Sequence, residues 1–192
     1  MPKKYYRQTN YEETSMSKGI ILFESKYGAT QKYATWLSEM TGFECHKTSS
    51  VKAEQLKDFD IIVLGGGVYA SGILGFSFLK KNFKLLKDKK IAVFAVGASP
   101  FEEKAVNQIK ERLFTGDLVN LSFFYCRGAW DEDAMSITHR TLCKMLQKAV
   151  AKKDPCEYEP WESALMCAVG QKCDWTDKKY LEPIVKWIEE GK

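Results

Sequence analysis

The chain has 192 residues, of which 45% are hydrophobic and 28% are charged, and its formal net charge is +4. These proportions are those of a soluble globular protein, and the length suits one domain with a full hydrophobic core. They exclude a membrane-spanning protein, because no apolar run approaches the roughly 20 residues that a spanning helix needs.

Residues 1–17 are interpreted as an N-terminal extension outside the core, which we expect to be poorly ordered. The segment is polar and aromatic, contains Lys3, Lys4 and Arg7, and lacks the apolar stretch of a signal peptide. Met16 is a second candidate for the natural start. We therefore expect one domain over residues 18–192 and a cytoplasmic location, with peripheral contact to the inner face of the membrane as an alternative.

The first strand is predicted over residues 19–23, and the loop after it is the most informative stretch of the chain. This loop carries small and hydroxyl-bearing residues: Ser25, Tyr27, Gly28 and Thr30. A predicted helix over residues 31–40 follows, and a helix N-terminus offers unpaired N–H groups and a dipole that favours an anion. Hydroxyl donors without a Lys or Arg cluster indicate the phosphomonoester of a cofactor. An ordinary turn capped by Thr30 is the alternative.

Two common nucleotide motifs are absent from this loop. There is no G-x-x-x-x-G-K-[ST], which argues against a nucleoside triphosphatase, and no G-x-G-x-x-G, which argues against dinucleotide binding at this position. A response-regulator receiver is also disfavoured, because Glu24 stands alone at the end of the first strand and strand three ends in Leu64-Gly65.

Strands and helices alternate along the rest of the chain. Further strands are predicted over residues 43–47, 60–64, 90–96 and 118–125. Further helices are predicted over residues 74–86, 101–114, 134–151 and 178–190, and residues 53–59 form a short polar connection. This alternation predicts an α/β fold with an open, doubly wound parallel sheet of five strands.

Two more loops end at the same edge of the predicted sheet. Strand three runs into Gly65, Gly66, Gly67, Val68 and Tyr69, and strand four runs into Gly97, Ala98 and Ser99. Glycines leave room for a backbone to approach a flat ring, and the tyrosine offers an aromatic face; tight turning alone is the alternative. Three such loops at one edge favour flavin mononucleotide (FMN) as the ligand.

The spacing Ser25-x-Tyr27-Gly28-x-Thr30 is similar to the [ST]-x-[ST]-G-x-[ST] phosphate loop of flavodoxins. It is closer to the S-[KR]-Y-G-x-T variant of flavodoxin-domain proteins of the menaquinone-dependent protoporphyrinogen oxidase type. The resemblance implies a flavodoxin-like sheet of order 2-1-3-4-5 with FMN at its switch point, and Tyr69 matches the aromatic that stacks on the flavin. The implied FMN-binding residues are Ser25, Lys26, Tyr27, Gly28, Ala29, Thr30, Gly66, Gly67, Val68, Tyr69, Gly97, Ala98, Ser99 and Trp130.

The interval between strand five and the last helix, residues 131–175, resembles an insertion of the same type, which an Asp174-Trp175 pair closes. It departs from that type in the acidic run Asp131-Glu132-Asp133, whose charges disfavour a polycarboxylate substrate such as protoporphyrinogen. The other interpretation of this run is that it caps the helix that begins near Ala134. The apolar stretch 164–169 could line a substrate or quinone pocket, contact a membrane or another subunit, or cover the flavin edge or the core.

Three residue groups have other interpretations. The six cysteines have no C-x-x-C spacing and are expected to be free thiols, without a metal site. Lysines at positions 80–90 form either a solvated helix end or an attractor for anionic lipid or substrate. His139, on a predicted helix, is the one candidate proton donor, and the sequence assigns no catalytic residue.

The preferred interpretation is an FMN-binding redox protein, an oxidoreductase acting on a quinone or a small organic substrate. The alternatives are a single-domain electron-transfer flavodoxin and a non-redox binding module of the same fold. The expected partners are a redox partner or quinone, a small organic substrate and a second copy of the chain, but no nucleic acid.

Overall fold

The structure is a computed structural model, and it describes residues 17–69 and 72–190. The predicted N-terminal extension lies outside the described residues except for Ser17, and so do Ala70 and Ser71 in the loop after strand three. Among the described residues, no helix combines the length and the apolar content needed to cross a bilayer.

Five parallel strands form the main sheet in the order β2-β1-β3-β5-β6. They are β1 (Gly19–Glu24), β2 (Glu44–Lys47), β3 (Ile61–Tyr69), β5 (Lys90–Gly97) and β6 (Ser122–Arg127). This is the predicted order 2-1-3-4-5, so the doubly wound, flavodoxin-like α/β fold is confirmed. A two-residue strand, β4 (Gly72–Ile73), pairs antiparallel with the end of β3.

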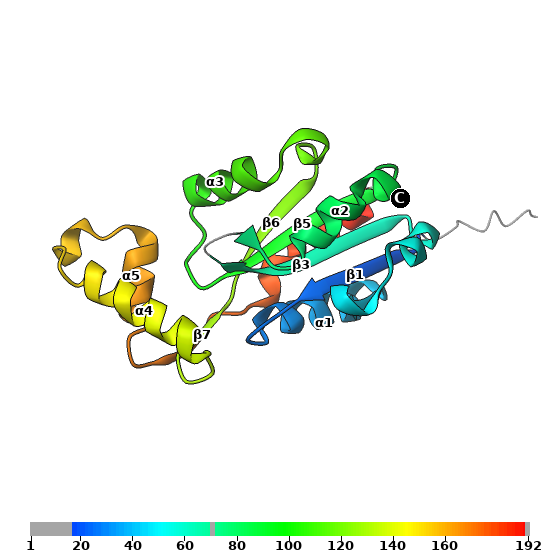
Figure 1. Cartoon of the computed structure of the whole chain (residues 1–192). Coiled ribbons are helices and arrows are strands. Elements are labelled where there is room, and N and C mark those ends of the chain that lie inside the picture. Colours follow the sequence, from blue (N-terminus) through cyan, green and yellow to red (C-terminus); the bar gives the residue numbers. More distant parts are fainter. Residues whose placement is uncertain (1–16, 70–71, 191–192) are drawn as a thin grey trace, which may run out of the picture.

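Helices cover both faces of this sheet (Figure 1). On one face lie α1 (Ala29–Thr41) and α6 (Glu182–Glu189), and on the other lie α2 (Phe76–Leu86) and α3 (Glu103–Leu113). The described residues also form short 3₁₀ turns: η1 Thr48–Ser50, η2 Ala53–Asp58, η3 Gly116–Leu118, η4 Pro155–Glu157 and η5 Lys178–Leu181.

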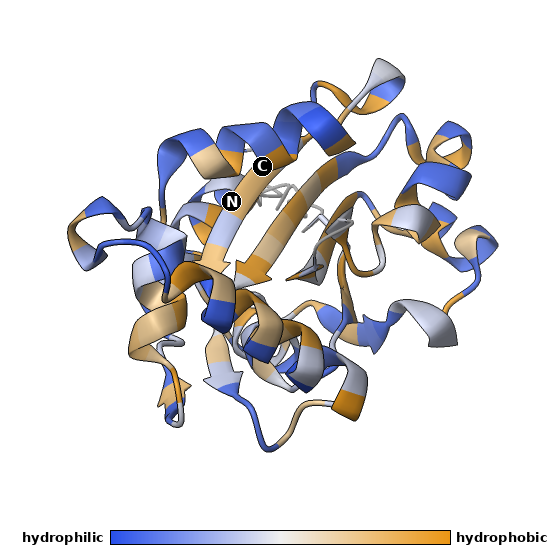
Figure 2. Ribbon diagram, turned by 60° about the vertical axis from the view of Figure 1, so that its left-hand side comes forward, coloured by the Kyte–Doolittle hydropathy of each residue, from blue (hydrophilic) through white to orange (hydrophobic). Residues whose placement is uncertain are grey.

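The alternation of side chains along each strand creates two cores. In β1, Ile20 and Leu22 enter the core under α2 and α3, whereas Ile21 and Phe23 enter the core under α1 and α6. All four are buried. Strands covered on both faces are continuous apolar runs in the sequence, and they are the largely orange centre of Figure 2.

Strand β3 continues to Tyr69, so the predicted strand end at Leu64 is wrong. Its glycines extend the ladder and pair with residues 94–96 of β5. A Cβ on Gly65 would collide with the Phe94 ring, and one on Gly66 would collide with the Leu74 carbonyl. Glycine therefore allows the strand to continue through a space that its neighbours fill.

Two other predicted boundaries differ from the structure. The fifth strand begins at Ser122 and not at residue 118, because residues 116–118 form the η3 turn and bury Leu118. The predicted polar connection over residues 53–59 contains the η2 turn, whose Ala53 and Leu56 are buried.

After β6 the chain leaves the sheet and forms what we call the α4–α5 segment, residues 129–174. It contains β7 (Ala129–Asp131), α4 (Ile137–Val150), α5 (Pro160–Cys167) and β8 (Lys172–Asp174). β7 and β8 pair antiparallel, and Figure 1 shows α4 and α5 projecting to one side of the sheet. The segment therefore stands apart from the layered domain.

The acidic run 131–133 does not cap α4, so that interpretation is wrong. The cap is Ser136, whose Oγ accepts a hydrogen bond from His139 N at 3.3 Å. Asp131 instead accepts hydrogen bonds from the backbone N–H of Asp133 and of Ala134, each at 3.1 Å, and pairs with Lys172 at 2.7 Å. The run thus shapes the turn between β7 and α4.

The apolar stretch 164–169 is largely internal to the α4–α5 segment. Leu165 is 7% exposed and Ala168 is fully buried, while Val169 at its end is 44% exposed. Beside them, the buried Glu162 pairs with Lys153 at 2.5 Å. The stretch therefore builds a small local core, and most of it is not a free surface.

The later lysines of the 80–90 cluster lie at the sheet edge opposite the predicted loops, because Lys90 begins β5. Lys90 Nζ donates hydrogen bonds to the Trp187 and Ile188 carbonyls at the end of α6, and it lies 4.4 Å from the Trp187 ring centroid. A surface hollow at this edge is lined in part by Lys84, Lys87 and Trp187. Lys84, Lys87 and Lys90 therefore lie away from a ligand held at the carboxyl ends of the strands.

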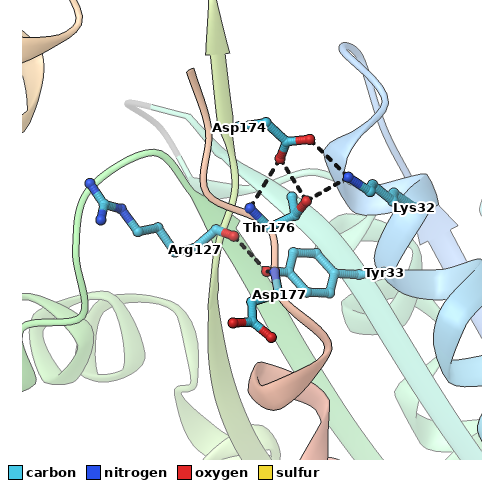
Figure 3. Close-up of polar contacts among 6 residues, drawn as sticks. All are labelled: Lys32, Tyr33, Arg127, Asp174, Thr176 and Asp177. Carbon is cyan, nitrogen blue, oxygen red and sulfur yellow. Dashed lines mark hydrogen bonds and ion pairs between the residues drawn. The ribbon is translucent and has the colours of Figure 1, made fainter.

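A polar clamp joins α1 to the return of the chain after β8 (Figure 3). The buried Tyr33 donates from its hydroxyl to the Arg127 carbonyl at 2.6 Å and accepts from Asp177 N at 3.0 Å. Lys32 Nζ donates to Asp174 and Thr176 side-chain oxygens, both at 2.8 Å. The clamp holds α1, the end of β6 and the start of η5 together.

Replacing Tyr33 with Phe removes both hydrogen bonds of the hydroxyl and keeps the ring. We expect the free energy of unfolding to fall by about 1–3 kcal/mol, because two backbone groups lose their partner at a buried position. Urea denaturation followed by circular dichroism measures the change, with Tyr158→Phe on the α4–α5 segment as the control. An unfolding midpoint equal to that of the unaltered protein would contradict the role of the clamp.

The Lys32 ammonium and the Thr176 hydroxyl hold the pKa of Asp174 at about 2, below its ordinary value of 3.8. A carboxyl whose pKa is lowered in the folded state stabilises the fold above its unfolded pKa, and this stabilisation is lost as the pH falls through the folded pKa. The pair is half exposed, which limits its contribution to below about 1 kcal/mol.

We therefore expect Asp174→Asn to flatten the pH dependence of stability between about pH 4 and pH 2, where the Asp174 carboxylate becomes protonated. Thermal unfolding across that range measures it, with Asp117→Asn, at an exposed carboxyl, as the control. Equal slopes for Asp174→Asn and the unaltered protein would rule out the Lys32–Asp174 pair as a source of acid sensitivity.

Candidate functional site

The loop after β1 forms an open helix N-terminus. Gly28 is the N-cap of α1 with a φ of 92°, and its N–H donates to Ser25 Oγ at 3.1 Å. No side chain caps the first turn, so Thr30 does not have the capping role that we considered as the alternative. The backbone N–H groups that open α1 are thus presented without a side-chain acceptor.

Thr30 instead points toward the end of β3. It is 3% exposed, and its Oγ1 lies 3.7 Å from the position where a Cβ on Gly67 would be. The same Cβ position lies 3.1 Å from the Tyr69 ring. A side chain on Gly67 would therefore press against the Tyr69 ring, so glycine at this position lets Tyr69 and Thr30 lie close to the backbone at the end of β3.

Val68 and Ala29, two other predicted binding residues, have packing neighbours. Val68 packs against the core under α2 and α3 and pairs with Ile73 of β4. Ala29 begins α1, and its Cβ lies 3.6 Å from the position of a Cβ on Gly128, after β6. These residues join the loops to the sheet.

The loop after β5 is held by groups on and after β6. The Gly97 carbonyl accepts from Gly128 N at 2.7 Å, the Ala98 carbonyl from Arg127 Nε at 3.3 Å, and the Ser99 carbonyl from Tyr125 Oη at 2.8 Å. Three successive carbonyls are thus oriented toward β6. The arrangement fixes the position of the loop next to the ends of β3 and β5.

A cluster of aromatic and titratable side chains lies between the first loop, β3 and α4. Tyr27 Oη and His139 Nδ1 share a hydrogen bond of 2.5 Å, and Lys26 Nζ lies 3.5 Å from His139 Nε2. The ring centroids of Tyr69 and His139 are 5.6 Å apart, and Lys26 Nζ lies 4.7 Å from the Tyr69 ring. Burial raises the pKa of Tyr69 to about 12. His139 therefore belongs to the site, although it is 112 residues from Tyr27.

Trp130 is not joined to this cluster. Its Nε1–H donates to Glu132 Oε1 at 3.4 Å, and it pairs across the β7–β8 ribbon with Cys173. The structure thus places Trp130 within the α4–α5 segment, among partners outside the three loops.

Two functional candidates escaped the sequence prediction. The Arg127 guanidinium, at the end of β6, lies 4.3 Å from the ring centroid of Trp175 and borders the loop after β5. Its position as the last residue of strand five was a usable signal, because that strand ends at the same sheet edge as the other loops. No comparable sequence signal marked Trp175. It reaches this position only in the folded chain, where it follows β8 and its N–H donates to the Gly128 carbonyl.

The donor set fits an organic phosphate and a flat ring better than a metal ion. An uncapped helix start with Ser25 and Thr30 suits a phosphate, and the side-chain-free Gly67 beside Tyr69 suits a ring. Among residues 17–69 and 72–190, no group of three or more His, Cys, Asp and Glu could hold a metal, and the six cysteines are free thiols.

Residues 20–156 match the family model described as "Flavodoxin domain", which covers most of the chain. The chain therefore belongs to the flavodoxin-domain family. This agrees with the sheet order and with the place of the phosphate-type loop after β1.

Solved structures give more distant likenesses. A WrbA-like flavodoxin protein from Agrobacterium tumefaciens is 17% identical, with 64% of this chain and 87% of that chain covered and a TM-score of 0.44. Flavodoxin 2 from Bacillus cereus is 23% identical, with coverages of 62% and 90% and a TM-score of 0.42. The Trp repressor binding protein from Bacillus subtilis is 19% identical, with coverages of 58% and 83% and a TM-score of 0.42. No curated protein matches the chain.

The hydrogen bond between Tyr27 and His139 ties α4 to the first loop, and Tyr27→Phe removes it while keeping both rings. We expect faster amide hydrogen exchange in the first turns of α4, with no change in β1 and β3, because the tie is local. Hydrogen exchange read by mass spectrometry measures this, with Tyr158→Phe as the control. Unchanged protection of residues 137–143 would show that the tie does not hold α4.

Proposed function

We propose that this protein binds FMN and acts as a flavin-dependent oxidoreductase. The observation that carries the proposal is the meeting, at one sheet edge, of an uncapped helix start bearing Ser25 and Thr30 with the glycine end of β3, where Gly67 lies beside Tyr69. Bound FMN would supply electron or hydride transfer, which no side chain here supplies.

The residues of the chain have distinct roles in this proposal. Ser25, Thr30 and the first N–H groups of α1 bind the phosphate, and Gly67 lets the backbone approach the ring. Tyr69 covers a ring face, where its flat aromatic surface excludes water. Tyr27 Oη and His139 Nδ1 hold a proton between them at 2.5 Å beside that face.

An enzyme is favoured over a carrier by the α4–α5 segment. An electron carrier needs an exposed flavin edge, whereas α4 brings His139 beside Tyr27 and Tyr69, where it would cover part of a bound flavin. Such a cover suits a substrate pocket that excludes water. The substrate class that we propose is a quinone or a small organic molecule, with protoporphyrinogen included on the resemblance to the menaquinone-dependent type.

In the structure, the acidic run 131–133 argues less strongly against a carboxylate substrate than it does in the sequence alone. Asp131 pairs with Lys172, Glu132 Oε1 accepts from Gln147 Nε2 at 2.7 Å, and Asp133 lies 3.7 Å from Arg140. Asp131 is thus compensated by a close cation, and Glu132 is held by a neutral donor within the segment. Arg127 beside Trp175 is a cation that could receive a substrate carboxylate at the mouth of the site.

Anaerobic turnover separates the enzyme from the carrier. The FMN-loaded protein is assayed with protoporphyrinogen as electron donor and a menaquinone analogue as acceptor, and its photoreduced form is assayed with a menaquinone analogue and with a one-electron acceptor, beside a His139→Gln variant. We expect two-electron transfer to the menaquinone analogue in at least one of these assays, and a lower kcat with unchanged FMN affinity in the variant. Transfer to the one-electron acceptor alone would assign a carrier, and the absence of flavin bands in the visible spectrum after incubation with FMN would assign a non-redox binding module.

Thr30→Ala and Ser25→Ala should each weaken FMN binding. Each removes one hydrogen bond to a charged phosphate, worth about 1.5–3 kcal/mol, which corresponds to a tenfold or larger rise in Kd. Quenching of flavin fluorescence measures the affinity, with Thr35→Ala, on the exposed side of α1, as the matched control. Equal affinity in all four proteins would place the phosphate elsewhere.

A further inference from the structure

Helix α4 presents three separate stripes of side chains. Its inward residues, spaced as a buried helix face, are Cys143, Gln147 and Val150. A second stripe, which we call the basic stripe, follows i, i+4 spacing: Arg140, Lys144 and Lys148. A third, the apolar stripe, follows i, i+3, i+4, i+7 spacing: Leu142, Met145, Leu146 and Ala149.

The apolar stripe is exposed to a degree that is unusual for large hydrophobic side chains. Leu142 is 62% exposed, Met145 is 67% exposed and Leu146 is 43% exposed. Trp161 on the adjoining α5 is 39% exposed, and Ile137, which lies on the side of the basic stripe at the start of α4, is 87% exposed. A contiguous apolar face on a projecting segment marks a surface that binds something, whereas single exposed hydrophobics do not.

Two features place this surface outside the layered domain but beside the candidate site. Figure 1 shows that α4 projects away from the sheet, and Figure 2 shows orange stretches on the α4–α5 segment, which that view brings forward. Leu142 and Leu146 lie three and seven residues after His139, so they share a helix side with it. A partner on this face would lie next to the cluster formed by Tyr27, Tyr69 and His139.

The charges on α4 limit the class of partner that can bind its apolar stripe. The helix contains no acidic residue, and Lys144 and Lys148 form no ion pair with any residue in 17–69 or 72–190. Two copies packed through this face would bring two basic stripes together, which like-charge repulsion disfavours. Leu, Met and Ile beside a row of lysines are the composition of helices that lie in the plane of an anionic bilayer.

We propose that the apolar stripe and the basic stripe of α4 form a docking surface for an anionic lipid membrane. In this orientation Leu142, Met145 and Leu146 enter the boundary between headgroups and acyl chains, and Lys144 and Lys148 reach the lipid phosphates. This surface does not depend on flavin. It would bring the candidate site close to a ligand dissolved in the membrane.

Vesicle flotation of the full chain tests the proposal, with vesicles of phosphatidylcholine alone and of phosphatidylcholine mixed with phosphatidylglycerol. We expect binding to the mixed vesicles that weakens as salt is raised. The double variant Leu142→Glu/Met145→Glu should lose at least about tenfold in affinity, because charges replace inserted apolar groups. Lys144→Gln/Lys148→Gln should lose about fivefold per lysine.

The controls are matched by exposure and charge on another part of the surface. Val119→Glu changes a residue that is 54% exposed next to η3, and Lys81→Gln/Lys84→Gln removes two exposed lysines of α2. Both should bind vesicles as the unaltered protein does, and circular dichroism of every variant reports the fold.

Three outcomes overturn the proposal. The first is no binding of the unaltered protein to the mixed vesicles, and the second is equal loss in the α4 variants and the controls. The third is concentration-dependent self-association, seen by analytical ultracentrifugation, that Leu142→Glu/Met145→Glu abolishes while vesicle binding stays unchanged. That result would assign the face to a second copy of the chain.

Discussion

The arrangement of the candidate site depends on the position of β3, which pairs with β1 on one side and with β5 on the other. Both neighbours are parallel to it, and its glycines continue the ladder past Leu64 because the Phe94 ring occupies the space that a side chain of Gly65 would need. This pairing places the carboxyl ends of three strands side by side, where backbone groups are free of the ladder and can meet a ligand. The two cores, one on each face, then hold the helices at fixed positions around that edge.

The clamp formed by Tyr33 and Lys32 and the tie between Tyr27 and His139 both start from the first loop and the first turns of α1. The clamp fixes the return of the chain after β8, and the tie fixes the start of α4. The element proposed to bind phosphate is therefore also the element that positions the α4–α5 segment. A ligand at the loop and the position of α4 are physically linked through one short stretch of chain.

Charge is organised differently on the two sides of this molecule. Within the α4–α5 segment Asp131 pairs with Lys172 and Glu132 accepts from Gln147, and the lysines at the start of β5 lie at the edge opposite the loops. The cations near the candidate site are instead Lys26 and Arg127, each set beside an aromatic ring. Net charge alone therefore says little about what the site attracts, because position decides which charges a ligand meets.

The alternation of strands and helices in the sequence determined the doubly wound sheet, because periodicity is a local property, and the resemblance of the loop after the first strand to flavodoxins supplied the strand order. The sequence could not show that the glycines after Leu64 stay in the strand, or that Trp130 lies outside the loop cluster, whereas the Ser136 cap of α4 is a local contact to His139 N that the sequence did contain. Nor could the sequence show that His139 contacts Tyr27, because the two residues are 112 positions apart in the chain. These features depend on side chains that meet only after the sheet has formed and the chain has returned through β8. Only the tertiary structure decided them, because long-range contacts leave no periodic signal in the chain.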